Sequence, residues 1–158
     1  MIVHIPQGTA ASPVSLAPGD ILEIVTEAGP RHLQVTHIRE PYPDVVRAIA
    51  PVSGARSAAE IARGDTAFTA MVELSRALSE DGAKARAIGH APLPEGAHVF
   101  PLFRLPIRNR AGEIVYWWHW DGEGLTVAPE AEASDSHLPI REVMPLSRLT
   151  ARLAALAG

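Results

Sequence analysis

The sequence predicts one α+β domain spanning residues 1–158, built on a strongly bent antiparallel sheet, or on an SH3-like partial barrel, with a C-terminal helix packed against it. Three observations predict this fold class. Several short segments alternate apolar and polar residues, which is typical of strands with one buried face. Tight turns join consecutive segments, which favours sequential antiparallel pairing. Residues 145–158 instead carry leucines at helical spacing.

The first part of the chain predicts a meander of short strands. They are expected at residues 2–5, 20–26, 31–39 and 45–50, where apolar and β-branched residues lie between turns rich in Gly and Pro. Because side chains alternate along a strand, Leu33 and Val35 would share one face of the strand at 31–39. Gln34 and Thr36 would lie on its other face.

The middle of the chain predicts short helices among strands. Ser57 and Glu60 have the spacing of a capping box, and Gly64 stands where a helix end would adopt a positive φ. Residues 66–73 favour a strand that is followed by a helical turn through Ser79, although their apolar spacing also suits a helix. A further strand is expected over residues 83–90.

The last part of the chain predicts a hairpin and the terminal helix. Residues 98–107 are expected to be extended, as an edge or bulged strand, because the prolines within them remove ladder donors. The strand EIVYWWHW, at residues 113–120, would turn at DGEG into a returning strand over 125–128. In the helix, Ser147 is the expected N-cap. Its buried stripe consists of Leu149, Leu153 and Leu156.

The stretch YWWHWDGEG holds all three tryptophans of the protein. On a strand, alternation puts a uniformly aromatic row on one face, and we expect this row to enter the core: Tyr116, Trp118 and Trp120. The other row is mixed and consists of Trp117, His119 and Asp121. It is a contact surface if solvent reaches it and part of the core if a helix or loop covers it. We predict that the mixed row forms one side of a binding surface, next to Gln34 and Thr36 on a neighbouring strand.

Two proline-containing segments, FPLFR (100–104) and LPIRE (138–142), each place an arginine directly after extended apolar residues. Arg104 and Arg141 either pair with acidic side chains inside the fold or form a fork for a carboxylate-bearing ligand. Both are therefore candidate binding residues.

Composition excludes several functional classes. Cysteine is absent, so disulfides, thiolate metal sites and cysteine nucleophiles are excluded together. The formal net charge of −4 offers no basic field for a nucleic-acid backbone. The first residues contain neither a basic leader nor an apolar run that could span a membrane, and we expect a cytoplasmic protein that binds neither nucleic acid nor membranes.

Motifs that fix a chemistry are missing from the sequence. It contains no G-x-G-x-x-G, Walker A, H-E-x-x-H or G-x-S-x-G pattern. His119 and Asp121 would share a strand face, as two metal ligands do, but no third ligand follows from the sequence. We therefore expect no catalytic residue, no metal and no cofactor.

Taken in order, PGDILEI, RHLQVTHI, VVRAI, HVFPLFR, YWWHWDGE and LPIRE resemble the pattern of a family of small uncharacterised bacterial proteins, over about residues 18–145. The G-D-I opening and the β-rich build are also loosely similar to immunity protein 26, from bacterial toxin–immunity systems. This second resemblance implies a compact, barrel-like protein that binds a partner protein, such as a toxin. The chain departs from the first pattern at His32-Leu33, where an aromatic residue would precede Gln34.

These observations predict a non-enzymatic binding module, with an immunity-type inhibitor of a partner protein as one form. The alternative is a small-molecule-binding protein or an enzyme that uses His119, Asp121 and an arginine in a pocket. The absence of a recognisable nucleophile–base spacing favours the binding module.

Overall fold

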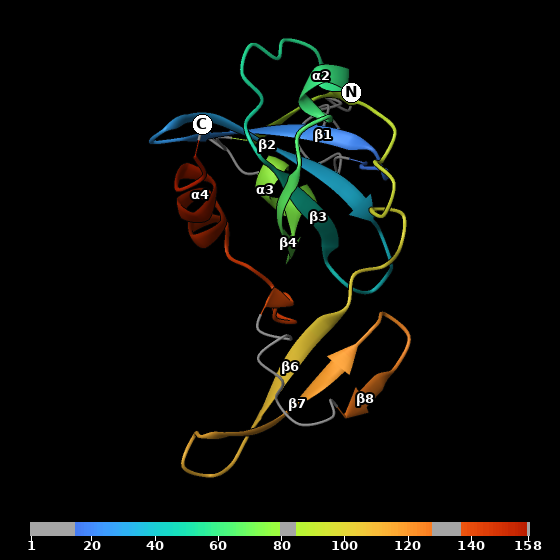
Figure 1. The fold of residues 1–158 in the computed structure, drawn as a ribbon, viewed down its shortest axis with the longest axis vertical. Helices are drawn as coiled ribbons and strands as arrows, with labels where there is room; N and C mark the ends of the chain where they lie inside the picture. Colours follow the sequence, from blue (N-terminus) through green and yellow to red (C-terminus); the bar gives the residue numbers. More distant parts are fainter. Residues whose placement is uncertain (1–14, 80–84, 128–136, 158) are drawn as a thin grey trace, which may run out of the picture.

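The computed structural model describes residues 15–79, 85–127 and 137–157, so the strand predicted at residues 2–5 lies outside the described residues. Within these ranges the protein is α+β, with eight strands in two antiparallel sheets and a C-terminal helix (Figure 1). The larger sheet has the order β4-β3-β2-β1-β5 and is open, so it does not close into a barrel. No helix in the described parts of the chain is long and apolar enough to cross a membrane.

The larger sheet confirms the predicted meander. Its strands are β1 (Asp20–Thr26), β2 (Gly29–His37), β3 (Asp44–Ile49), β4 (Thr66–Val72) and β5 (Ala85–His90). β1 pairs with β2, β2 with β3 and β3 with β4, each antiparallel. β5 pairs, also antiparallel, with the free side of β1. The edges of this sheet are therefore β4 and β5.

One face of the larger sheet holds an aliphatic core under the terminal helix α4 (Leu146–Ala154). Leu33 and Val35 face this core, as strand alternation predicts, and so do Leu149 and Leu153 of α4. Leu156 is only partly buried against it. The predicted cap is wrong, because the N-cap residue is Pro145 and no side chain caps the helix.

The opposite face of the sheet is covered by the short helix α2 (Ala58–Ile61). The Ser57 half of its predicted capping box is confirmed, since the Ser57 side chain accepts a hydrogen bond from the backbone N–H of Glu60. The positive φ predicted for Gly64 is wrong. Glycine is needed there for another reason, because a Cβ would lie 2.4 Å from the carbonyl oxygen of Ala50. The backbone of the α2 loop approaches the sheet too closely for a side chain.

The smaller sheet projects beyond one end of the larger one (Figure 1). Its strands are β6 (Phe103–Arg108), β7 (Ile114–Trp120) and β8 (Leu125–Val127), in the order β6-β7-β8. An aromatic cluster joins the two sheets. Phe103 and Trp120 enter it from the smaller sheet, and Val45 and Met71 enter it from the larger one.

A second connection between the sheets is a chain segment that we call the bridging segment, residues 138–144. It lies parallel to β6 at Ile140, where the amide of Arg104 donates to the carbonyl of Pro139 and the amide of Arg141 donates to the carbonyl of Arg104. A few residues later it reaches β4, where the amide of Met144 donates to the carbonyl of Met71 over 2.8 Å. The bridging segment therefore ties the outer edge of β6 to that of β4.

Candidate functional site

The smaller sheet has two faces of different composition. Its register places Phe103 opposite Trp120, and Leu105 opposite Trp118. The eight side chains that share this side are all apolar or aromatic, and we call it the apolar face: Phe103, Leu105, Ile107, Tyr116, Trp118, Trp120, Leu125 and Val127. The reverse side, the mixed face, carries Trp117 and His119 from β7 and Arg104 and Pro106 from β6.

The apolar face is buried around Phe103 and Trp120 and solvated at the other end of β7 and along β8. Phe103 and Trp120 are 0% and 3% exposed, because they reach the aromatic cluster between the sheets. Tyr116, at the far end of β7, is 43% exposed, and on the edge strand β8 Leu125 and Val127 are 41% and 62% exposed. The prediction that the whole aromatic row is core is therefore wrong for Tyr116, and Trp118 is only half-buried. The aromatic row extends beyond the larger sheet, which covers only the Trp120 end of the row.

The mixed face is organised by Arg104. Its guanidinium lies 4.3 Å from the ring centroid of Trp117, and its Nε donates a hydrogen bond to the carbonyl of Leu138. Trp117 is consequently half-buried, like Trp118. The two rows thus do not differ in burial as strand alternation led us to expect, since an arginine covers one row and the larger sheet covers only part of the other.

Asp121 shapes the turn between β7 and β8. Its Oδ1 accepts hydrogen bonds from the amides of Gly124 and Glu123, and these bonds, with the nearby charge of Arg39, hold the pKa of its carboxyl below the usual range. Gly122 has a φ of 91°, where other residues are strained, and a Cβ there would lie 2.8 Å from the ring of Phe100. The acidic, glycine-rich turn is therefore required by the local structure.

Arg141 stacks on the other side of the sheet. Its guanidinium lies 4.3 Å from the ring of Trp120 and 5.6 Å from that of Tyr42. Because Trp117 and Trp120 are three residues apart on one strand, they point to opposite faces, and so do the arginines that stack on them. The structure therefore does not bring Arg104 and Arg141 together as a fork. Each makes a cation–π contact, which the sequence offered no means of predicting.

Gln34 and Thr36 lie in the larger sheet and are both buried, so they do not extend the mixed face. The predicted pairing of their strand with β7 is wrong, because β7 pairs with β6 and β8. Gln34 instead belongs to a polar network around Arg47, a residue that the sequence analysis missed. The Arg47 side chain donates to the Gln34 side chain and to the carbonyls of Ala62 and Gly64, at 2.7–3.0 Å.

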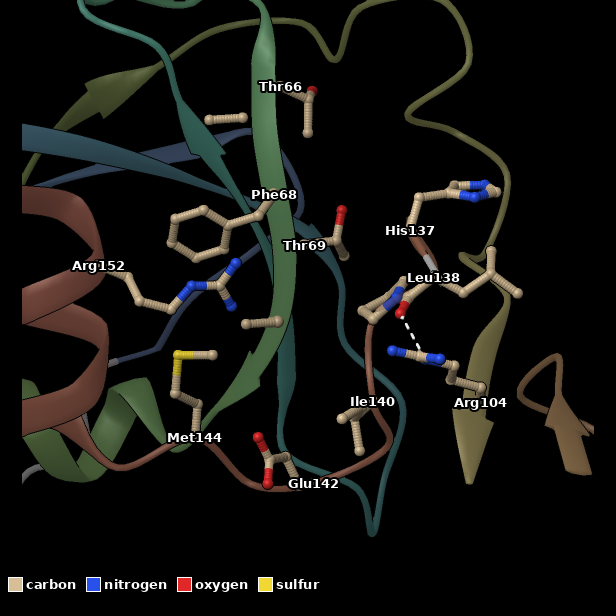
Figure 2. A pocket seen from close by; sticks show the side chains of 13 residues that line it. Thr66, Phe68, Thr69, Arg104, His137, Leu138, Ile140, Glu142, Met144 and Arg152 are labelled. Carbon is tan, nitrogen blue, oxygen red and sulfur yellow. Dashed lines mark hydrogen bonds between the residues drawn. The ribbon is translucent and has the colours of Figure 1, made fainter. Parts of the chain in front are cut away.

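A groove of about 540 Å³ opens between β4 and the bridging segment (Figure 2). We call it the edge groove. Five consecutive residues of β4, Thr66 to Ala70, line one wall, and residues 137–140 line the other. Arg152 of α4 reaches into it beside Phe68, with the guanidinium 3.9 Å from the ring centroid, while Arg104 approaches from β6 (Figure 2). The predicted pocket residues His119 and Asp121 do not line this groove.

Neither metal-site geometry nor similarity to known proteins assigns a function to these surfaces. Within residues 15–79, 85–127 and 137–157, no three His, Asp or Glu side chains gather as a metal site requires. Comparison of the chain with protein-family models, with curated proteins and with solved structures finds no match.

Proposed function

We propose that the protein is a non-enzymatic binding module that holds a partner protein against the apolar face of its smaller sheet. The observation that carries this proposal is the solvated part of that face, where Tyr116 of β7 and Leu125 and Val127 of the neighbouring strand β8 are exposed. Contiguous apolar surface of this kind is costly in water and is typical of protein interaction sites. Tyrosine and tryptophan, both present here, are enriched among residues that dominate binding energy.

The surroundings of the apolar face indicate what kind of partner it fits. Arg108, Arg110 and Glu113 are exposed around the β6–β7 turn, next to Tyr116, and give this part of the rim a net positive charge. An interface with an apolar centre and a basic rim is complementary to a partner with an apolar patch and an acidic rim. An immunity-type inhibitor that binds a toxin is one form of this function, in line with the resemblance of the sequence.

Affinity capture from the native host tests the proposal. The immobilised wild-type protein is expected to retain a stoichiometric protein partner. Tyr116→Glu and Val127→Glu should each lose it, because a charge at the centre of an apolar interface costs binding energy that no partner group repays. Val25→Glu is the matched control, since Val25 is 50% exposed on β1, away from the smaller sheet. It should retain the partner.

Other outcomes separate the competing sites. If Trp117→Ala releases the partner while Tyr116→Glu retains it, the mixed face is the binding surface. If a small ligand is retained and no protein is, the alternative function as a small-molecule binder or enzyme replaces the binding module. The structure favours the alternative less, because Asp121 is engaged in its own turn and the edge groove includes only Arg104 from the predicted His/Asp/Arg set.

A further inference from the structure

The outer edge of β4 presents unused backbone groups to the edge groove. The carbonyl of Met71 points away from β3, because it accepts the bond from the Met144 amide. In an antiparallel pair alternate residues turn their backbone groups the same way, so the N–H and C=O of Thr69 also point outward. No described residue forms a hydrogen bond with these two groups of Thr69.

The opposite wall presents a matching pair. The bridging segment bonds to β6 through the carbonyl of Pro139 and the amide of Arg141. The N–H and C=O of Ile140, which lies between them, therefore point away from β6, and Ile140 lines the groove. The walls are joined where Met144 bonds to Met71, and they separate toward Thr66 and His137 (Figure 2).

We propose that the edge groove binds an extended, acidic peptide segment of the partner protein, which enters as an added strand between β4 and the bridging segment. Backbone groups of the peptide would bond to Thr69 on one side and to Ile140 on the other. The added strand would bond to β4 of the larger sheet on one side and to the bridging segment on the other, and the bridging segment in turn bonds to β6 of the smaller sheet. Strand addition here presupposes the partner-binding function proposed above and adds a second contact to it.

The charge of the groove specifies an acidic segment. Arg152 and Arg104 both line the groove, from opposite sides of the gap. Among the described residues no carboxylate pairs with Arg152, whose guanidinium rests on the ring of Phe68. Glu142, the one acidic side chain among the described residues of the lining, is engaged by Arg148. A carboxylate on the peptide would therefore meet positive charge that no described acidic side chain neutralises.

Selection from a displayed library of random peptides tests this proposal. Wild-type protein is expected to enrich peptides that combine β-branched residues with Asp or Glu and lack proline at their centre. An enriched peptide, synthesised with a fluorescent label, is then titrated against variants. Thr69→Pro should weaken binding by about tenfold or more, because it removes the outward amide donor while an edge strand tolerates proline at such a position. Thr69→Val keeps the amide and should bind as the wild type does.

Arg152→Ala should weaken the same peptide by about fivefold, while Arg86→Ala, which removes an equal charge on β5, should leave its affinity unchanged. Circular dichroism of Thr69→Pro confirms that the sheet is retained. Failure to enrich any peptide, or equal binding by the wild type and Thr69→Pro, would overturn strand addition. A partner that is lost with Tyr116→Glu and kept with Thr69→Pro would refute the edge groove and leave the proposed function standing.

Discussion

Arg47 carries a positive charge in the middle of the larger sheet, at 1% exposure. Burial lowers the pKa of its guanidinium, and the charge of Asp65 partly opposes this shift. Its hydrogen bonds tie β3 to Gln34 on β2 and to the loop after α2. The residue therefore fixes the position of α2 on the sheet, and the cost of its burial is offset only while every acceptor is in place.

Replacing Arg47 by Met should destabilise the fold strongly, because methionine fills much of the space and leaves the acceptors around it unpaired. We expect a loss of about 3–5 kcal/mol in the free energy of unfolding, measured by urea titration. Arg86→Met is the control, since the Arg86 side chain is exposed and its ion pair with Glu23 is worth only about 0–1 kcal/mol. Similar losses in the two variants would show that the buried network does not stabilise the fold.

Glu23 makes stability depend on pH in the acid range. Burial raises the pKa of its carboxyl, but hydrogen bonds and charges from Arg86 and His32 outweigh burial and lower it overall. Because the folded pKa lies below the unfolded one, ionised Glu23 stabilises the fold above the unfolded pKa, about 4.3. This contribution is lost as the pH falls through the folded pKa.

Glu23→Gln should therefore be less stable than the wild type at about pH 6, and the difference should shrink at about pH 3. Urea titrations at both pH values measure it. A difference that does not change with pH would mean that Glu23 acts through packing alone.

At the scale of elements, α4 depends on two fully buried leucines. Leu153→Ala should lower the free energy of unfolding by about 2–5 kcal/mol, as expected for a leucine at 0% exposure in a packed core. Leu156→Ala, one turn further along, should cost less because Leu156 is only partly buried. Thermal unfolding of both variants ranks them. An unchanged melting temperature for Leu153→Ala would show that α4 is not held by the sheet.

The strands of the larger sheet could be predicted from sequence because alternation and turn residues are local properties. Leu33 and Val35 face the aliphatic core as predicted, since that choice depends only on a period of two. The exposure of Tyr116 could not be predicted this way. It depends on where the larger sheet stops covering β7, which is set by pairings between distant residues such as Met71 and Val143.

The candidate site was predicted only in part for the same reason. The sequence drew attention to β7, to Arg104 and to Arg141, all of which lie in or beside the smaller sheet. It gave no signal that Gln34 would be buried with Arg47, or that the guanidinium of Arg104 would cover Trp117. These contacts join residues far apart in the chain, and no local pattern encodes them.

In the molecule as a whole, the aromatic cluster is what anchors the smaller sheet. Trp120→Ala should therefore lower the hydrogen-exchange protection of β6 and β7 amides, while amides of β1 to β3 keep theirs, because the larger sheet retains its own core under α4. Trp117→Ala is the comparison, since Trp117 lies outside the cluster. Equal loss of protection in both sheets would show that they unfold as a single unit.

The packing of α4 also has a consequence for how the chain is made. Its leucines complete a core that includes Leu22 of β1, yet residues 146–154 are synthesised long after β1. At roughly 5–20 residues per second, ribosomes need about 6–25 s to cover the interval from β1 to α4. Throughout that time the aliphatic face of the growing meander is open to water. We expect the nascent chain to be a client of ribosome-associated chaperones until α4 emerges and closes over it.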